Sequence, residues 1–314
     1  MELFRIQAVV NGERNKKYIA QLQQLLACEM TVELHKYTFD TAGEPLFELN
    51  LKNDNTIVCL PKLPQFQLIK HGPIIYKAAA AIVADFIVQH LESHMMEQMI
   101  ARKYASYSKT DRASILQFSQ IVLQGEDWDG YGAKFIEADQ KRRKQVIATE
   151  LFDYWSTDSL LLLEGFTTFR LAAYRQELNE VIEYALDEFV LEKQYKEFID
   201  LLKYFVYLQD TKQEVVHLFH YSGQDFTLYD KNFEPITVEH NSDAIVAEMI
   251  ETEMNMNDMV LSSLIAVSPA KIIVHTKVPQ QQIIRTIASI FENRVTVCSQ
   301  CAHCSKLATE GSQP

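Results

Sequence analysis

The longest stretch without a helix breaker constrains the fold most. The segment "IIYKAAAAIVADFIVQHLESHMMEQMIARKY", residues 74–104, consists largely of strong helix formers and has neither Gly nor Pro over 31 residues. Gly72-Pro73 directly before it predicts the start of this helix. Further helical runs follow at 112–124, 135–155, 169–195 and 196–210, with loops predicted at 125–132 and 156–159. The pattern predicts a central helical bundle over residues 71–212.

Both flanking parts of the chain alternate between strand and helix patterns. Residues 1–70 predict an α/β segment, with strands at 3–10, 31–39, 45–51 and 56–60 and a helix at 15–30. Residues 213–314 predict a second α/β unit that ends in a cysteine cluster. It has a β-hairpin at 214–221 and 226–230, helices at 242–254 and 257–267, and a β-α-β pattern over 271–276, 279–292 and 294–298. The expected fold class is therefore α+β.

The charge balance narrows the classes of partner. A net charge of -12 and a pI near 5.3 argue against a phosphate-binding surface, so nucleic acid is not an expected partner. The basic run "KRRK", residues 141–144, covers every side of a helix and predicts a solvated or locally salt-bridged stretch. A nucleic-acid-associated factor that uses this run is a third, lesser hypothesis.

Three sequence patterns bear on the cellular compartment of the protein: signal peptide, membrane span and disulfide framework. The N-terminus has no signal-peptide pattern, and Lys77 and Asp85 interrupt the most apolar stretch, so no membrane span is expected. Five cysteines, with Cys28 and Cys59 isolated, do not make a secreted disulfide framework. These features predict a cytoplasmic protein with reduced thiols.

Three cysteines at three-residue intervals are the most informative chemical motif. Cys298, Cys301 and Cys304 form C-x2-C-x2-C directly after a predicted strand, where a tight loop lets thiolates converge on one ion. Zinc requires four ligands, so one is missing. The candidates are His275, His303, and a residue of a second subunit or partner protein. His275 ends the preceding parallel strand, and His303 is awkwardly adjacent to Cys304.

Other interpretations of the cysteines stay open. An iron-sulfur cluster normally uses a fourth cysteine that is missing here, so it is less expected than zinc. A redox dithiol usually opens a helix, and the sequence after Cys304 provides little helix. The absence of any bound cofactor is the remaining alternative.

Other histidines and aromatic residues favour structural roles. His90 and His94 share a helix face but do not form a metalloprotease motif, and His217 and His220 are expected on opposite faces of one strand. An aromatic series is predicted to form either the core of the bundle or a face that binds a partner: Phe189, Phe198, Tyr204, Phe205 and Tyr207.

The string "LEGFTTFRLAAYRQELNEVIEYALDEFVLEKQYKEFIDLLKYFVYLQ", residues 163–209, resembles the YtxC-like sporulation proteins of endospore-forming bacteria. The likeness extends through the hairpin and "SPAKIIVH" to the terminal cysteines, over the C-terminal two thirds or more of the chain. The resemblance implies an association with spore formation and supplies no set of catalytic residues.

Enzyme signatures are missing from the sequence. It contains no phosphate-binding glycine loop, no G-x-S-x-G motif and no dinucleotide fingerprint. We therefore expect a non-catalytic, sporulation-associated protein that acts by binding an unknown protein partner or a second copy of itself. The alternative is a metal-dependent or redox enzyme that uses the cysteine cluster.

Overall fold

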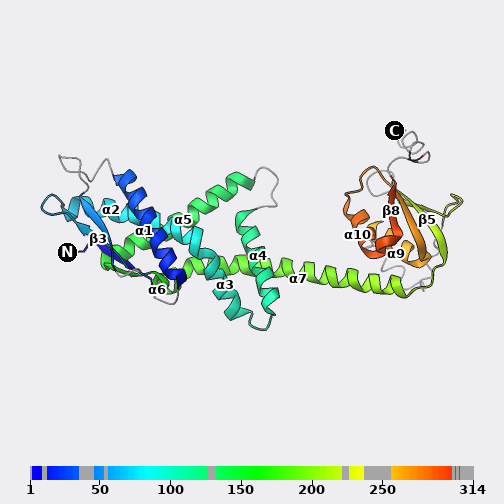
Figure 1. The fold of residues 1–314 in the computed structure, drawn as a ribbon, viewed down its shortest axis with the longest axis horizontal. Helices are drawn as coiled ribbons and strands as arrows, with labels where there is room; N and C mark the ends of the chain where they lie inside the picture. Colours follow the sequence, from blue (N-terminus) through cyan, green and yellow to red (C-terminus); the bar gives the residue numbers. More distant parts are fainter. Residues whose placement is uncertain are drawn as a thin grey trace. The chain divides into compact units, whose positions relative to one another are not determined.

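The computed structural model describes residues 2–8, 13–34, 46–52, 56–125, 132–220, 226–236 and 256–298, together with Cys301 and Cys304. The chain divides into two compact units, Met1–Val190 and Leu191–Pro314, and the elements of each are shown in Figure 1. Each unit contains helices and a four-stranded sheet, which confirms the α+β class. The division into 1–70, 71–212 and 213–314 stays a prediction.

The sheet of the first unit joins two distant parts of the chain. Its strand order is β2-β3-β1-β4, from β1 (Phe4–Gln7), β2 (Phe47–Lys52), β3 (Thr56–Pro61) and β4 (Leu160–Leu162). β1 pairs antiparallel with β3 and parallel with β4, which follows the helix α5 (Gly132–Thr157). The N-terminal strand is therefore held by a strand that lies beyond most of the helical region.

The helices of the first unit surround one core. They are α1 (Glu13–Leu34), α2 (Leu68–Phe86), η1 (Ile87–Leu91), α3 (Glu92–Lys103), α4 (Lys109–Gln124), α5 (Gly132–Thr157), α6 (Leu163–Gly165), η2 (Phe166–Arg170) and the part of α7 (Ala172–Leu208) that ends at Val190. α2 packs against both α1 and α5. The breaker-free stretch is thus helical, with a π-helical turn in its middle.

The predicted helix start at Gly72-Pro73 is wrong, because α2 already begins at Leu68 and contains Pro73. Proline has no N–H and leaves the carbonyl of residue i−4 without its helical partner. That residue is Ile69, which is 95% exposed. Water can therefore satisfy the carbonyl, and the helix tolerates the proline.

The strand predicted at 31–39 is also wrong in its first part, because α1 continues to Leu34. Its buried positions Ile19, Leu22, Leu26 and Met30 keep helical spacing up to the last turn. Residues 35–39 lie outside the described part of the chain, as do most of the predicted loop at 125–132 and the predicted helix at 242–254.

One continuous helical run, Leu68–Lys103, is long and apolar enough by composition to cross a membrane. Half of its most apolar window is buried inside the structure. Ile75, Ala79, Val83 and Phe86 are all completely buried and belong to the core of the first unit. Packing within that core therefore accounts for the apolar composition of this helix.

The second unit positions the cysteine cluster. Its described elements after α7 are β5 (Gln213–His220), β6 (Phe226–Tyr229), α9 (Met256–Val267), β7 (Pro269–His275), α10 (Gln282–Phe291), η3 (Glu292–Arg294) and β8 (Val295–Cys298). The sheet order is β6-β5-β7-β8, with an antiparallel β5–β6 hairpin and parallel β5–β7 and β7–β8 pairs. Both the predicted hairpin and the predicted β-α-β unit are confirmed.

The two faces of this sheet have different roles. Val216, Leu218, Ile272 and Val274 alternate onto one face, are completely buried, and belong to the same core as residues of α9 and α10. The alternation places His217, Phe219 and His275 on the other face. That face carries the candidate site.

Candidate metal centre

The ends of two parallel strands bring His275 and Cys298 together. His275 is the last residue of β7, Cys298 is the last residue of β8, and the two are direct register partners. Directly paired residues of neighbouring strands point to the same face of a sheet, about 4.8 Å apart in the backbone. The β-α-β connection therefore places an imidazole beside a thiol, as the sequence predicts.

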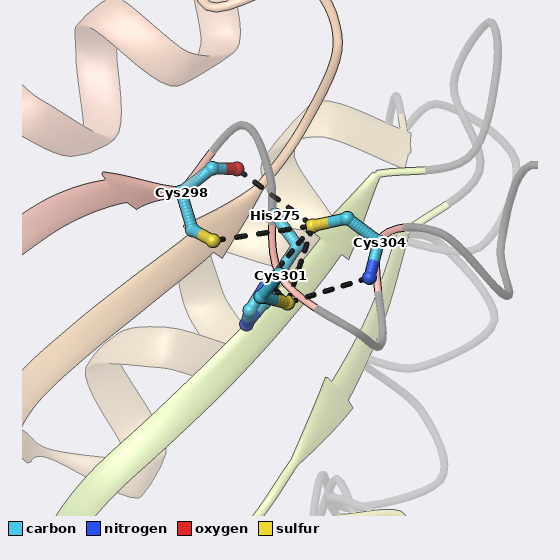
Figure 2. A group of neighbouring side chains, drawn as sticks. All are labelled: His275, Cys298, Cys301 and Cys304. Carbon is cyan, nitrogen blue, oxygen red and sulfur yellow. Dashed lines mark hydrogen bonds between the residues drawn. The ribbon is translucent and has the colours of Figure 1, made fainter.

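Cys301 and Cys304 return to the same point, as Figure 2 shows. Nδ1 of His275 lies 3.3 Å from Sγ of Cys304 and 3.5 Å from Sγ of Cys301. Sγ of Cys304 is 3.5 Å from Sγ of Cys301 and 4.0 Å from Sγ of Cys298. All four ligand atoms lie within 4.8 Å of one another. Within the described residues, this group could hold a metal ion.

The separations fit a tetrahedral ion. Zinc–sulfur bonds of about 2.3 Å and zinc–nitrogen bonds of about 2.05 Å give tetrahedral edges of about 3.8 Å between sulfurs and about 3.6 Å between sulfur and nitrogen. The observed sulfur–sulfur distances of 3.5 and 4.0 Å bracket the first value, and the nitrogen–sulfur distances of 3.3 and 3.5 Å are close to the second. The cluster is therefore already near the geometry of a zinc site with one histidine and three cysteine ligands.

The protonation of Cys304 shows what a metal would change. Burial, together with hydrogen bonds to the Cys301 and Cys298 thiols, raises the pKa of the Cys304 thiol to about 11. Without a metal this sulfur holds its proton at neutral pH. A metal ion would displace the proton and bind the thiolate, so metal affinity should rise with pH.

His275 is oriented by aromatic rings and by a second histidine. Its ring stacks on Phe219 with centroids 4.2 Å apart and an angle of 8° between the planes. Nε2 of His275 lies 3.0 Å from Nδ1 of His217. A neutral His275 that binds metal through Nδ1 carries its proton on Nε2 and donates it to His217. This contact fixes the tautomer that a ligand requires.

His217 is held in turn by Phe233, whose ring stacks on it at a centroid distance of 4.3 Å. Phe233 has a φ of 64°, a left-handed conformation that costs a non-glycine residue about 1–2 kcal/mol. The Asp230 carboxylate stabilises this turn by accepting hydrogen bonds from the N–H groups of Asn232 and Glu234. The strained turn thus presents an aromatic ring to the site.

The sequence does not reveal His217 as part of the site. His217 and His220 do lie on opposite faces, as predicted, and His220 instead contacts Thr276, with 2.9 Å between Nδ1 and Oγ1. The contact of His217 with His275 depends on the parallel pairing of β5 with β7. The two-residue spacing of His217 and Phe219 predicts that they share one face of their strand. It indicates a place in the site only when the pairing of β5 with β7 is known.

The other histidine predictions have different outcomes. His303 lies outside the described residues. The His90 ring contacts the Phe86 ring in a tilted arrangement, with centroids 4.9 Å apart and 47° between the planes. Nδ1 of His94 lies 3.2 Å from the Glu97 carboxylate on an exposed helix face. Both therefore have the structural contacts expected of helix-surface histidines.

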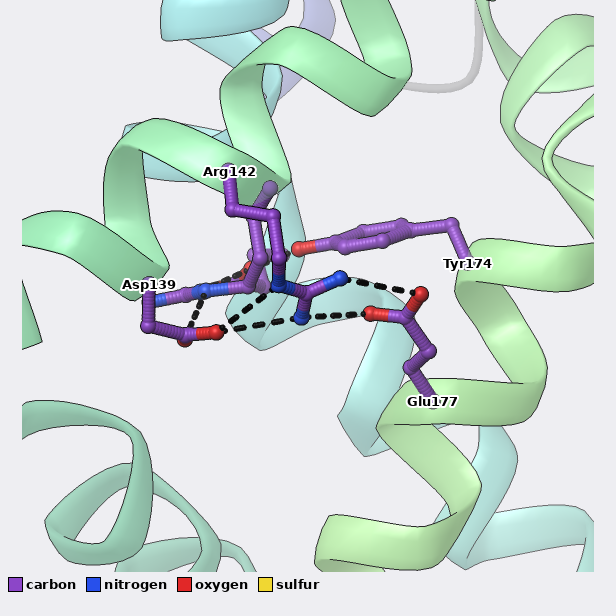
Figure 3. A network of polar contacts seen from close by, with 6 residues as sticks. Asp139, Arg142, Tyr174 and Glu177 are labelled. Carbon is purple, nitrogen blue, oxygen red and sulfur yellow. Dashed lines mark hydrogen bonds and ion pairs between the residues drawn. The ribbon is translucent and has the colours of Figure 1, made fainter.

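The "KRRK" run is salt-bridged, as predicted. Arg143 is buried and contacts the Glu92 carboxylate at 2.5 Å and the Asp139 carboxylate at 2.9 Å. Arg142 pairs with Asp139 and with Glu177 at 3.0 and 2.9 Å (Figure 3). Lys144 pairs with Asp85. These acids neutralise most of the basic run and tie α5 to three other helices.

The aromatic series divides along α7. Phe189 is buried in the first core, whereas Phe198, Tyr204, Phe205 and Tyr207 are 49–79% exposed. The core interpretation is wrong for these four residues. The alternative, a face that binds a partner, remains a prediction.

Fold and site together define a two-unit α+β protein with one histidine and three cysteines grouped at the end of a parallel β-α-β unit. The model of the YtxC-like family matches residues 77–296, and the chain belongs to this family. It is 25% identical to the "Uncharacterized protein YtxC" of Bacillus subtilis (strain 168) over 245 residues, which cover 77% of this chain and 84% of that protein. No solved structure matches the chain.

Proposed function

We propose that this protein is a non-catalytic, cytoplasmic sporulation protein that acts by binding protein partners, and that its second unit holds a structural zinc ion. The convergence of His275, Cys298, Cys301 and Cys304 carries the zinc proposal. With four protein ligands, a zinc ion is closed to substrate, as in structural rather than catalytic zinc sites. The family resemblance supports the link to sporulation.

Metal analysis of protein purified anaerobically without added metal tests the zinc proposal. We expect about one zinc per chain and no visible absorption, because thiolate–zinc bonds have no colour whereas iron-sulfur clusters absorb strongly. Cys301→Ser should lose the zinc. Cys28→Ser is the matched control, since Cys28 is an exposed cysteine of α1, and it should keep the zinc. Visible absorption or metal-free protein would refute the proposal.

Counting reactive thiols distinguishes a structural site from a redox centre. In the native protein Cys28 should react quickly, and the three ligand thiols should react only after a chelator is added. Cys59 is buried, and burial raises the pKa of its thiol far above its usual range, so it should react only on unfolding. Rapid formation of a disulfide among Cys298, Cys301 and Cys304 under mild oxidation would instead favour the redox alternative.

Deletion of the gene in the encoding organism tests the role in sporulation. We expect a lower yield of heat-resistant spores, restored by the wild-type gene. An unchanged yield would contradict this part of the proposal and leave the metal site unaffected.

A further inference from the structure

A groove between α2 and α5, with α1 at one end, is not used by the proposed function. Its volume is about 780 Å³, and sites for small molecules usually measure about 300–1,000 Å³. Every residue that lines it belongs to a described part of these three helices, so the groove is formed entirely within the first unit. Its shape and its charges indicate what kind of molecule fits it.

The middle of the groove is apolar and narrow. α2 and α5 pack against each other, and Ala78, Ala81 and Ala148 line the groove with single methyl groups. Packed helices lie about 8–10 Å apart, which leaves no room between them for a third helix with its diameter of about 10 Å. An alkyl chain is about 4 Å thick and fits above these methyl groups. The middle of the groove therefore suits a hydrocarbon chain.

The groove is also long. On α2 its lining residues extend from Pro73 to Asp85, which is about 18 Å at a rise of about 1.5 Å per residue. On α5 they extend from Lys141 to Phe152, which is about 16 Å. Carbon–carbon bonds of about 1.5 Å at tetrahedral angles give an extended alkyl chain a rise of about 1.25 Å per carbon, so about 14 carbons fill this length.

One end of the groove, which we call the basic end, carries excess positive charge. Asp85 is the last lining residue of α2 and pairs with Lys144, and Lys141 lies one helical turn before Lys144. Among the described residues, Lys141 forms no ion pair. Two ammonium groups and one carboxylate thus leave one positive charge, in a chain whose net charge is -12. The basic end is complementary to an anionic head group.

The opposite end of the groove has no excess charge. Tyr18 of α1 contacts Phe86 of α2, and Glu29 lies about 16 Å further along α1, so the two helices run antiparallel and Glu29 lines the groove near Pro73. Lys77 lines the groove one turn from Pro73. Glu29 and Lys77 contribute one negative and one positive charge. The difference between the ends favours an anionic head group at the basic end, with the tail extending away from it.

We propose that this groove binds a saturated fatty acid of about 14 carbons. Its carboxylate lies at Lys141, and its alkyl chain extends along Ala81 and Ala148 toward Phe152. The groove belongs to the first unit and the metal centre to the second. The fatty-acid site therefore goes beyond the proposed function and does not depend on it.

Equilibrium dialysis of the full chain against radiolabelled myristate, a saturated fatty acid of this length, tests the site below the micelle concentration. We expect one saturable myristate per chain. Octanoate should bind at least about 10-fold more weakly, because it buries fewer methylene groups. Tetradecyltrimethylammonium, which has the same tail and a positive head group, should also bind at least about 10-fold more weakly, because it cannot form a charge-assisted hydrogen bond with Lys141.

Two substitutions test the tail and the head separately. Ala81→Trp places a large side chain in the groove and should abolish myristate binding, whereas Ala101→Trp changes an exposed alanine of α3 that does not line the groove and should not. Lys141→Glu should weaken binding by at least about 10-fold. Lys109→Glu makes the same change of net charge on α4 and should leave the affinity unchanged. Unchanged helical circular dichroism shows that each variant is folded.

Three results would each overturn the fatty-acid site. The first is the absence of saturable myristate binding, which would leave a helix of a protein partner as the occupant to test. The second is equally tight binding of tetradecyltrimethylammonium, and the third is an unchanged affinity in folded Ala81→Trp. Zinc measured on the same samples tests the metal proposal separately, since metal-free protein that binds myristate would refute only that proposal.

Discussion

At the scale of single residues, His217 decides how well His275 can act as a ligand. It accepts the Nε2 proton of His275 when Nδ1 binds a metal, and both rings lie within one aromatic stack. His217→Phe keeps the stacking with Phe233 and removes the acceptor. We expect zinc affinity to fall about 10–100-fold. Competition with a chromophoric chelator measures this.

His94→Phe is the control for this substitution, because His94 lies on an exposed helix face in the first unit. It should leave the zinc affinity unchanged. If His217→Phe also binds zinc as tightly as the wild type, the hydrogen bond does not set the tautomer of His275.

His275 and His217 differ in how far their roles in the site can be predicted from the sequence. His275 can be predicted as a ligand, because β7 and β8 follow one another along the chain and parallel strands end at the same edge. His217 cannot, because its position depends on pairing between β5 and β7. Residues 221–268 separate these two strands, which is too far for a local pattern to specify the pairing.

At the scale of elements, a buried ion pair joins α3 and α5. Glu92 accepts hydrogen bonds from Arg143 and from the Tyr174 hydroxyl of α7, and all three residues are buried. Glu92→Leu would remove one of the two ion pairs of the buried Arg143 guanidinium and leave the pair with Asp139. We expect the free energy of unfolding to fall by about 3 kcal/mol, since an incompletely paired buried charge is costly. Urea denaturation measures it.

Glu177→Leu is the matched control, because it also removes a glutamate from an arginine pair. Glu177 and Arg142 have 39% and 53% exposed side chains, so water replaces the lost contact. A loss of only about 0–1 kcal/mol is expected. Equal losses in the two variants would show that burial does not decide the strength of these pairs.

Element boundaries are harder to predict than element types, for local reasons. The pattern separates helices at 169–195 and 196–210, whereas α7 is one helix, because no breaker lies between them. Pro73 predicts a helix start, but the helix begins one turn earlier, because Ile69 is exposed and water can satisfy the carbonyl that Pro73 leaves unpaired. The sequence shows which residues favour the start or end of a helix. Solvent exposure, which lets Pro73 lie inside a helix, is set by tertiary packing and cannot be seen in a local pattern.

At the scale of the whole molecule, the two units have separate cores. The buried residues of the first core end at Phe189 and those of the second begin at Ile199. A metal that binds only the folded second unit should therefore stabilise that unit alone, by about 4 kcal/mol when free zinc is about 1,000-fold above its dissociation constant. Local stability can differ in this way when cores are distinct.

Hydrogen exchange with and without a zinc chelator tests this independence. Amides of β7 that exchange through unfolding of the second unit should exchange about 1,000-fold faster after zinc is removed, because exchange follows the free energy of opening. Amides in the buried part of α2, around Val83, should keep their rates, since they belong to the first core. Equal acceleration in both places would mean that the units unfold together, and that the continuous helix α7 transmits the loss of the metal from one core to the other.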